Sequence, residues 1–186
     1  MPKIAEIEPT PNPNARRFTL REPLTRGVTR SFERAADADG DPLATALFAI
    51  PHVVSVFYVD SYLTVTQDGQ AAWSALEREL APPIRQAPAA GRDAPAAPAA
   101  EAAWVAGLSD RDRGRLRAID HLLDTTVRPA LLADGGGLEV QGLAGNRLLV
   151  RYQGACGTCP SSYTATLMGI ENVLKGLEPD LELVLV

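Results

Sequence analysis

The stretch from Leu138 to Leu177, LEVQGLAGNRLLVRYQGACGTCPSSYTATLMGIENVLKGL, decides the fold of the second half of the chain. Two apolar runs, residues 138–143 and 148–152, flank Gly145-Asn146, and this pattern predicts two strands joined by a tight turn. Residues 154–159 are predicted to form a loop. The apolar residues after that loop recur at helical spacing, which predicts an amphipathic helix. They are Tyr163, Leu167, Ile170, Leu174 and Leu177.

Further elements are expected on both sides of this stretch. Ser109 with Asp112 three residues later is typical of a helix N-terminus, and an apolar stripe from Leu116 to Val127 continues the helix. Pro129 is expected to kink or shorten this helix, and the glycines at 135–137 to end it. A strand is expected at 181–186, so the predicted order is α-β-β-α-β.

The composition changes abruptly over residues 81–103, which hold 11 Ala and 5 Pro. Prolines block a continuous helix, and alanines bury too little area to offset the cost of ordering the chain. We therefore expect a first domain over residues 1–81, an Ala/Pro-rich flexible linker over 82–103 and a second domain over 104–186.

The first half is also predicted to be a small α+β domain. Asp41-Pro42 fits a helix N-cap followed by proline at the first helical position, and Trp73, Leu76 and Leu80 recur at helical spacing. Strands are expected at residues 4–8, 17–20, 53–59 and 63–66. The fold class is therefore α+β, with two small two-layer α/β-sandwich domains joined by the linker.

The charge and the N-terminus exclude several classes of protein. The 186 residues include 18 Lys+Arg against 23 Asp+Glu, and this balance, without a basic block, argues against a nucleic-acid partner. No apolar run approaches the roughly 20 residues that span a bilayer. Residues 1–6, MPKIAE, lack the apolar core of a signal peptide. We expect a cytoplasmic protein with no membrane association.

Both cysteines of the chain, Cys156 and Cys159, lie in the loop GACGTCPSS at residues 154–162, just before a predicted helix. A helix N-terminus favours thiolate over thiol, and thiolates are both metal ligands and nucleophiles. Gly154 and Gly157 permit close approach of the backbone and angles closed to other residues. Because glycine, threonine and serine around the thiols are not a core composition, we expect neither cysteine to be a core residue.

The number of thiols limits what the loop can bind. A structural zinc site or a common iron–sulfur cluster takes four protein ligands, whereas this chain supplies two thiolates and no nearby histidine. Two chains therefore share one site, or the metal is partly open, or there is no metal.

Local chemistry leaves four interpretations of these cysteines. Thiol–disulfide exchange has the same weight as metal binding on the motif alone. Against exchange, the preceding strand is predicted to be the second of a hairpin rather than part of a βαβ unit. The third interpretation is a zinc-bridged structural dimer, and the fourth is a pair of inert buried cysteines.

The second half resembles the NifU-like C-terminal domain of the Nfu family of iron–sulfur proteins. Residues 134–139, DGGGLE, resemble the family's acidic-Gly-Gly signature, and residues 154–162 resemble its cluster-binding loop. Residues 168–171, MGIE, resemble the helix that follows. The first half resembles the family's N-terminal domain at residues 10–15, TPNPNA, and 41–44, DPLA.

This resemblance implies an iron–sulfur cluster scaffold or carrier rather than an enzyme. It implies Cys156 and Cys159 as ligands of a cluster, 4Fe-4S in preference to 2Fe-2S, shared by a homodimer. The implied partners are upstream cluster-assembly proteins and the apo iron–sulfur client proteins that receive the cluster. No set of catalytic residues is predicted.

Other polar and aromatic residues are expected to have structural roles. Asp134 is expected to help end a helix. The arginines from Arg111 to Arg117, which alternate with acidic residues, are expected to form a solvated helix face. His52, His121 and Trp73 are expected to be structural or solvated.

Overall fold

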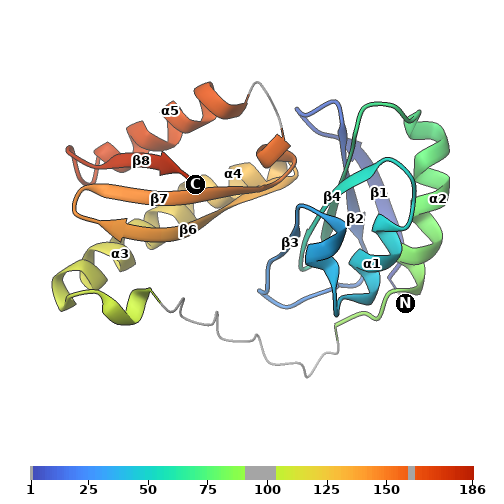
Figure 1. The fold of residues 1–186 in the computed structure, drawn as a ribbon, viewed down its shortest axis with the longest axis horizontal. Coiled ribbons are helices and arrows are strands. Elements are labelled where there is room, and N and C mark those ends of the chain that lie inside the picture. The colour runs from blue at the N-terminus through green and yellow to red at the C-terminus, as the bar shows by residue number, and fades with distance from the viewer. Residues whose placement is uncertain (1, 91–103, 159–161) are drawn as a thin grey trace. The chain divides into compact units, whose positions relative to one another are not determined.

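The computed structural model describes residues 2–90, 104–158 and 162–186 (Figure 1). The chain divides into two compact units, Met1–Ala99 and Ala100–Val186. Each unit has its own sheet and its own apolar core, so the predicted α+β class with two domains is confirmed. Residues 91–103, which hold most of the predicted linker, lie outside the described residues.

The first unit is a five-stranded antiparallel sheet with strand order β1-β2-β5-β4-β3. Its strands are β1 (Ile4–Pro9), β2 (Ala15–Leu20), β3 (Arg30–Phe32), β4 (Val53–Val59) and β5 (Tyr62–Gln67). Its helices are the 3-10 helix η1 (Ala35–Ala38), α1 (Pro42–Phe48) and α2 (Trp73–Gln86). The sequence did not predict β3 or η1, because three- and four-residue elements are too short to show a period.

Both α-helices of this unit pack on one face of the sheet. The Asp41 side chain accepts a 2.9 Å hydrogen bond from the amide of Ala44, and this cap starts α1 as predicted. Leu47 of α1 and Leu80 of α2 then meet Phe18 of β2 in a common core cluster. The first unit is therefore a two-layer arrangement with a continuous core between helices and sheet.

Helix α2 continues through two prolines. Pro82 and Pro83 lie inside it, Ile84 is fully buried (0% exposed), and the amide of Ala87 donates to the carbonyl of Pro83 at 3.0 Å. The expectation that the prolines after Ala81 block a helix is wrong for this last turn, because burial of Ile84 offsets the lost backbone bonds. The folded part of the first unit thus extends past the boundary predicted at residue 81.

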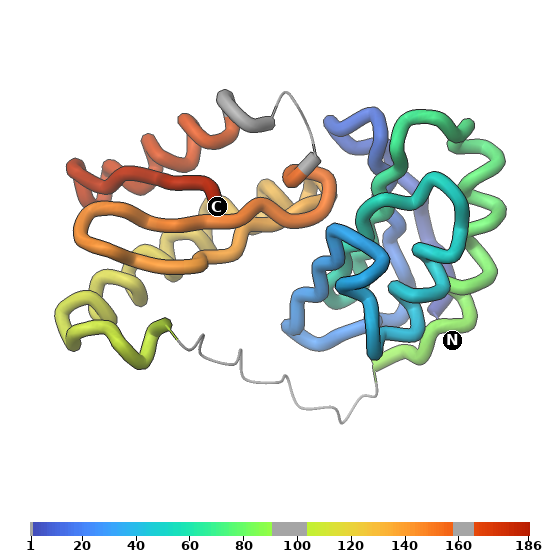
Figure 2. Tube along the Cα trace, in the orientation of Figure 1, coloured from blue at the N-terminus to red at the C-terminus, as the bar shows by residue number. Residues whose placement is uncertain are grey.

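The second unit has a three-stranded sheet in the order β6-β7-β8. Its strands are β6 (Gly136–Ala144), β7 (Arg147–Gly154) and β8 (Glu182–Leu185). Its α-helices are α3 (Asp110–Leu122), α4 (Arg128–Ala133) and α5 (Ser162–Lys175), and shorter turns are η2 (Val105–Gly107), the π-helical η3 (Leu123–Val127) and η4 (Ala155–Thr158). Figure 2 shows the backbone of the β6–β7 hairpin and of β8.

Local signals set the ends of the first helical segment of this unit. The Ser109 hydroxyl accepts a 3.1 Å hydrogen bond from the amide of Asp112, as the capping pattern predicts. Proline at 129 has no N–H to donate, and the helix widens into η3 just before it and resumes as α4. Asp134 follows α4 as its C-cap, and Gly135 then has a φ of 81°. Gly136 already belongs to β6, two residues earlier than the predicted strand.

One face of this sheet and its helices enclose the second core. The fully buried members of that core include Ile119, Leu123, Leu148, Leu174 and Leu181. Among the described residues of the whole chain, no helix has the length and apolar character needed to cross a membrane.

The predicted solvated arginine face is wrong at Arg115. Its guanidinium donates to Glu178 at 2.6 Å, to Asp112 at 2.9 Å and to the carbonyl of Gly145 at 3.0 Å. These bonds join α3 to the residues before β8 and to the β6–β7 turn. Arg115 is therefore a structural clamp of the second unit.

Candidate functional site

Cys156 lies where β7 ends and the chain turns toward α5. Gly154, the last residue of β7, has a φ of 60° and pairs with Gly136 of β6. The next amide, that of Ala155, donates a 3.1 Å hydrogen bond to the carbonyl of Gly135. Gly154 therefore has a backbone angle that is closed to most other residues, as the sequence predicted. Its pairing with Gly136 fixes the position of the backbone just before Cys156.

The thiol of Cys156 is buried. The residue is 4% exposed and belongs to the core cluster of the second unit. The expectation that Cys156 is not a core residue is wrong, because the polar composition of residues next to it in sequence does not report what packs against it from β6. A cysteine of this kind is sheltered from solvent until the turn that carries it moves.

The start of β6 lies directly against this thiol. A Cβ atom built on Gly136 would be 2.6 Å from the Cys156 Sγ. The sequence marked residues 135–137 only as a helix end and a family signature. A run of glycines inside a strand is also a signal of close backbone approach, and that signal could have predicted this contact.

Cys159, the second predicted ligand, lies outside the described residues, as do Pro160 and Ser161. The structure therefore places one of the two predicted site residues. Within the described ranges, no group of three or more His, Cys, Asp or Glu side chains is arranged to hold a metal ion.

The strand before the cysteines belongs to two supersecondary units. β7 is antiparallel to β6, as predicted, and it is also parallel to β8 through the crossover that contains α5. The prediction that β7 is not part of a βαβ unit is wrong, because each residue of β7 that pairs with β8 has its partner 35 positions away in sequence. The topology thus no longer argues against thiol–disulfide exchange.

Each histidine has a place within its own unit. His52 has a φ of 74° in the turn before β4, and its Nδ1 lies 3.1 Å from the Asp68 carboxylate. The hydrogen bond with His52 holds the pKa of Asp68 below its usual value. His121 is in the last turn of α3.

Trp73 also has a structural contact, since its indole Nε1 donates to the carbonyl of Pro13 at 3.0 Å. The Arg16 guanidinium lies 4.9 Å from the centroid of its ring. Trp73 is therefore tied to the turn between β1 and β2.

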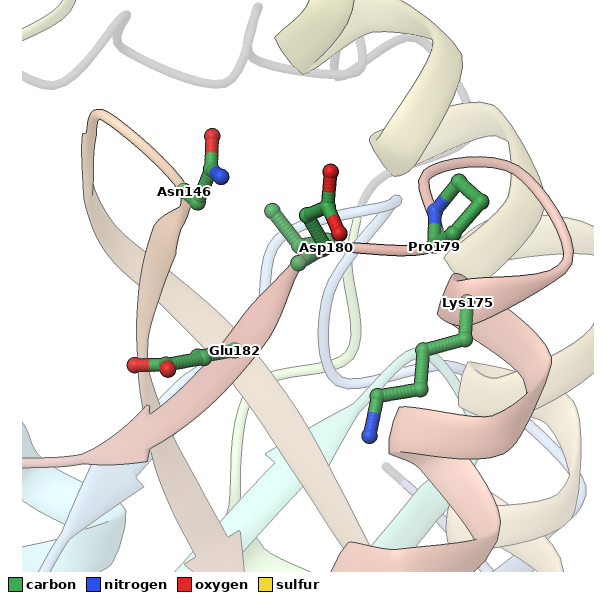
Figure 3. A pocket seen from close by; sticks show the side chains of 6 residues that line it. Asn146, Lys175, Pro179, Asp180 and Glu182 are labelled. Carbon is green, nitrogen blue, oxygen red and sulfur yellow. The ribbon is translucent and has the colours of Figure 1, made fainter.

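An open hollow of about 460 Å³ lies at the other end of β7. Figure 3 shows Lys175, Asp180 and Glu182 among its lining side chains, together with Asn146 and Pro179. Because Asn146 precedes β7 and Cys156 follows it, this hollow is separated from the thiol by the length of the strand. Its lining supplies the carboxylates of Asp180 and Glu182 but no sulfur or imidazole ligand, so it is not a thiolate or imidazole metal site.

The fold and site define a two-domain α+β protein whose second domain carries Cys156, the first cysteine of a Cys-x-x-Cys sequence, just after β7. Residues 4–91 match the family described as "Scaffold protein Nfu/NifU N terminal", and residues 119–184 match the "NifU-like domain". The chain belongs to the Nfu/NifU family.

Similar proteins match along most of the chain. NifU-like protein 4, mitochondrial, of Arabidopsis thaliana is 32% identical over 95% of this chain and 66% of its own length. The human protein "NFU1 iron-sulfur cluster scaffold homolog, mitochondrial" is 33% identical over 95% of this chain and 69% of its own length. The chain thus spans about two thirds of these relatives.

A NifU-like protein of Saccharomyces cerevisiae, solved by solution NMR, is 28% identical over 42% of this chain and 72% of its own, with a TM-score of 0.39. A likeness at that TM-score adds no weight to the family assignment.

Proposed function

We propose that this chain is an iron–sulfur cluster scaffold and carrier. The observation that carries the proposal is that its only two cysteines, separated by two residues, lie in a domain of the NifU-like family. The human relative, named as an iron–sulfur cluster scaffold homolog, supports a scaffold role, and the plant relative is named as NifU-like. Transfer of a cluster, rather than conversion of a substrate, is the activity that we infer.

The cluster is the cargo, and we infer that two chains hold it together. Cys156 and Cys159 supply two thiolates, whereas a common cluster takes four, so a second copy of the chain supplies the other two. Separation of the chains would halve the ligands, which makes the bound cluster labile and suits delivery. We propose a 4Fe-4S cluster as this cargo.

Delivery requires only ligand exchange. The thiolates of an apo client protein would bond to the irons while Cys156 and Cys159 of each carrier chain leave, with no net oxidation or reduction. The cytoplasmic location predicted from the sequence stays a prediction, and the relatives cited are named as mitochondrial proteins.

Cysteine variants test this function. We expect the Cys156→Ser and Cys159→Ser chains to retain no stable cluster after anaerobic supply of iron and sulfide, measured by absorbance and iron content. Thr158→Ser changes a residue between the two thiols without removing a ligand, so it is the matched control and should load fully. Full cluster retention by Cys156→Ser would contradict the assignment.

A second candidate function is thiol–disulfide exchange, which the parallel β7–β8 crossover favours. In that function Cys156 attacks a client disulfide and Cys159 resolves the mixed disulfide. It predicts a metal-free monomer that reduces disulfides catalytically. An insulin-reduction assay on the unsubstituted chain separates the two functions, since the carrier should give no turnover.

A further inference from the structure

We propose that Gly136 is a positioning residue for the Cys156 thiol. Because Gly136 has no side chain, its backbone forms one wall of the pocket in which this thiol is buried in the cluster-free chain. The inference deepens the proposed function, because it concerns how one ligand of the cargo is kept before loading. It assigns to β6 a role in a site whose ligands come after β7.

The space around Gly136 carries this inference. A Cβ at this position would lie 2.6 Å from the Cys156 Sγ, 2.6 Å from the carbonyl oxygen of Gln153 and 2.9 Å from the Cys156 amide nitrogen. Two of these three atoms are backbone, so a change of side-chain rotamer cannot relieve the contact. A methyl group at 136 would have to displace the turn that carries Cys156 and also shift the Gln153 carbonyl of β7.

Two adjacent glycines serve different purposes here. Gly135 has a φ of 81°, a conformation that L side chains rarely adopt. Gly136 is not among the described residues with positive φ, so its backbone accepts alanine and only the missing space forbids it. Alanine at 136 is therefore a direct probe of the pocket.

The two strands leave the turn little room to retreat. Gly136 pairs with Gly154, and the Ala155 amide donates to the carbonyl of Gly135 at 3.1 Å. Relief of the contacts with Cys156 must therefore come after Ala155, whereas the contact with the Gln153 carbonyl lies within the β6–β7 pair itself. The thiol would leave a pocket in which it is now 4% exposed.

A buried thiol must become exposed before it can bind the cluster. A ligand shared with a second chain must reach beyond its own core, so the turn has to move outward when the cargo binds. Until then the pocket protects Cys156 from oxidants and alkylating agents, whose attack requires access to the sulfur.

The test measures alkylation of Cys156 in the cluster-free, full-length chain. In a Cys159→Ser background only one thiol remains. We expect Gly136→Ala to raise the rate of reaction with iodoacetamide by about tenfold or more, because overpacking shifts the local opening equilibrium. The rate is followed by intact mass at fixed pH, well below the unfolding temperature.

Gly142→Ala in the same background is the matched control. It lies in the same strand, and its Cβ would meet the Leu149 Cδ1 at 2.7 Å, the flexible end of a side chain distant from the thiol. We expect its alkylation rate to equal that of the parent. A folded Gly136→Ala chain, verified by circular dichroism, that reacts at the parent rate would overturn the proposal.

Should Gly136→Ala fail to fold, the parent alone still tests the pocket. The Cys159→Ser chain should react about tenfold or more slowly in native buffer than in urea, corrected for the reactivity of a free cysteine in each solvent. Equal rates would overturn the proposal. Neither outcome depends on whether the unsubstituted chain binds a cluster, so this inference and the carrier function fail separately.

Discussion

Both units pack helices against a sheet around an apolar core, but glycine has a different role in each. Gly27 and Gly40 of the first unit have φ values of 67° and 84°, and a Cβ on either would meet no atom within 4 Å. These glycines serve turns. Gly136 of the second unit serves a contact, because its missing side chain makes room for Cys156.

The difference in glycine use follows a difference in topology. The first unit is antiparallel throughout, and the sequence places no cysteine in it. In the second unit, β7 pairs with β6 on one side and in parallel with β8 on the other, and the chain between β7 and β8 carries the thiols. The comparison indicates that the second unit packs a bare backbone against its thiol, whereas the first unit has no cysteine to accommodate.

Large-to-small changes in the two cores should have the largest effects and should separate the units. Leu80 and Leu148, each 0% exposed, lie in the first and second core respectively. We expect Leu80→Ala and Leu148→Ala each to lower the free energy of unfolding of its own unit by about 2–5 kcal/mol, measured by urea denaturation.

Cluster content distinguishes these two variants. Leu80→Ala should load a cluster as the unsubstituted chain does, whereas Leu148→Ala, in the strand that leads to Cys156, should retain less. Equal loss of cluster in both would contradict the separation of roles between the units.

The Arg115 clamp should have the next largest effect. We expect Arg115→Met to destabilise the second unit by about 1–3 kcal/mol at neutral pH, since it leaves Glu178 without its partner and removes one of the hydrogen bonds to Asp112. Arg117→Met, at an exposed position on the same helix, is the control and should change little. The first unit should unfold unchanged in both.

Acid should weaken the same clamp. The hydrogen bond from Arg115 holds the pKa of the Glu178 carboxyl below its usual value. Because the folded pKa is depressed, the stabilisation is complete above the unfolded pKa of about 4.3 and is lost as pH falls through the folded pKa. Arg115→Met should lose this acid-dependent part of the unfolding free energy, measured by urea titrations between neutral and acidic pH.

A smaller effect is expected from a buried hydroxyl of the first unit. Tyr58 donates to the Asp41 carboxylate that caps α1, and burial together with this bond raises the tyrosine pKa. Tyr58→Phe should destabilise the first unit by about 1–2 kcal/mol without changing cluster content. Tyr62→Phe, half-buried in the neighbouring strand, is the control for loss of a hydroxyl.

The smallest effect should come from a turn glycine. Gly40→Ala forces a side chain into a φ of 84° but meets no neighbour, so we expect a cost of about 1 kcal/mol. The alkylation rate of Cys156 should not change. A change in that rate would contradict the distinction between turn glycines and the contact glycine.

The sequence predicted the features that depend on neighbours in the chain. The caps at Asp41 and Ser109 are confirmed, since each side chain accepts an amide hydrogen bond three residues on. The strands of the two predicted hairpins are also confirmed. They could be predicted because the alternation of apolar residues and the turn residues are both local signals.

The features that the sequence did not predict depend on distant residues. Helix α2 continues past Pro83 because Ile84 is buried in the core. Helix propensity describes only the local sequence, so it could not predict this burial. The parallel pairing of β7 with β8 and the burial of Cys156 also arise from other strands. Family resemblance assigned Cys156 and Cys159 as ligands, but it did not predict that Cys156 is enclosed.

Metal content with oligomeric state, measured on one anaerobically purified sample, tests the carrier function most directly. The account predicts iron and acid-labile sulfide in equal amounts, about two of each per chain for a four-iron cluster shared by two chains. It also predicts a dimer that falls to monomers when the cluster is removed. A metal-free monomer that stays empty after iron and sulfide are supplied would contradict the account, as would a colourless dimer with zinc in place of iron.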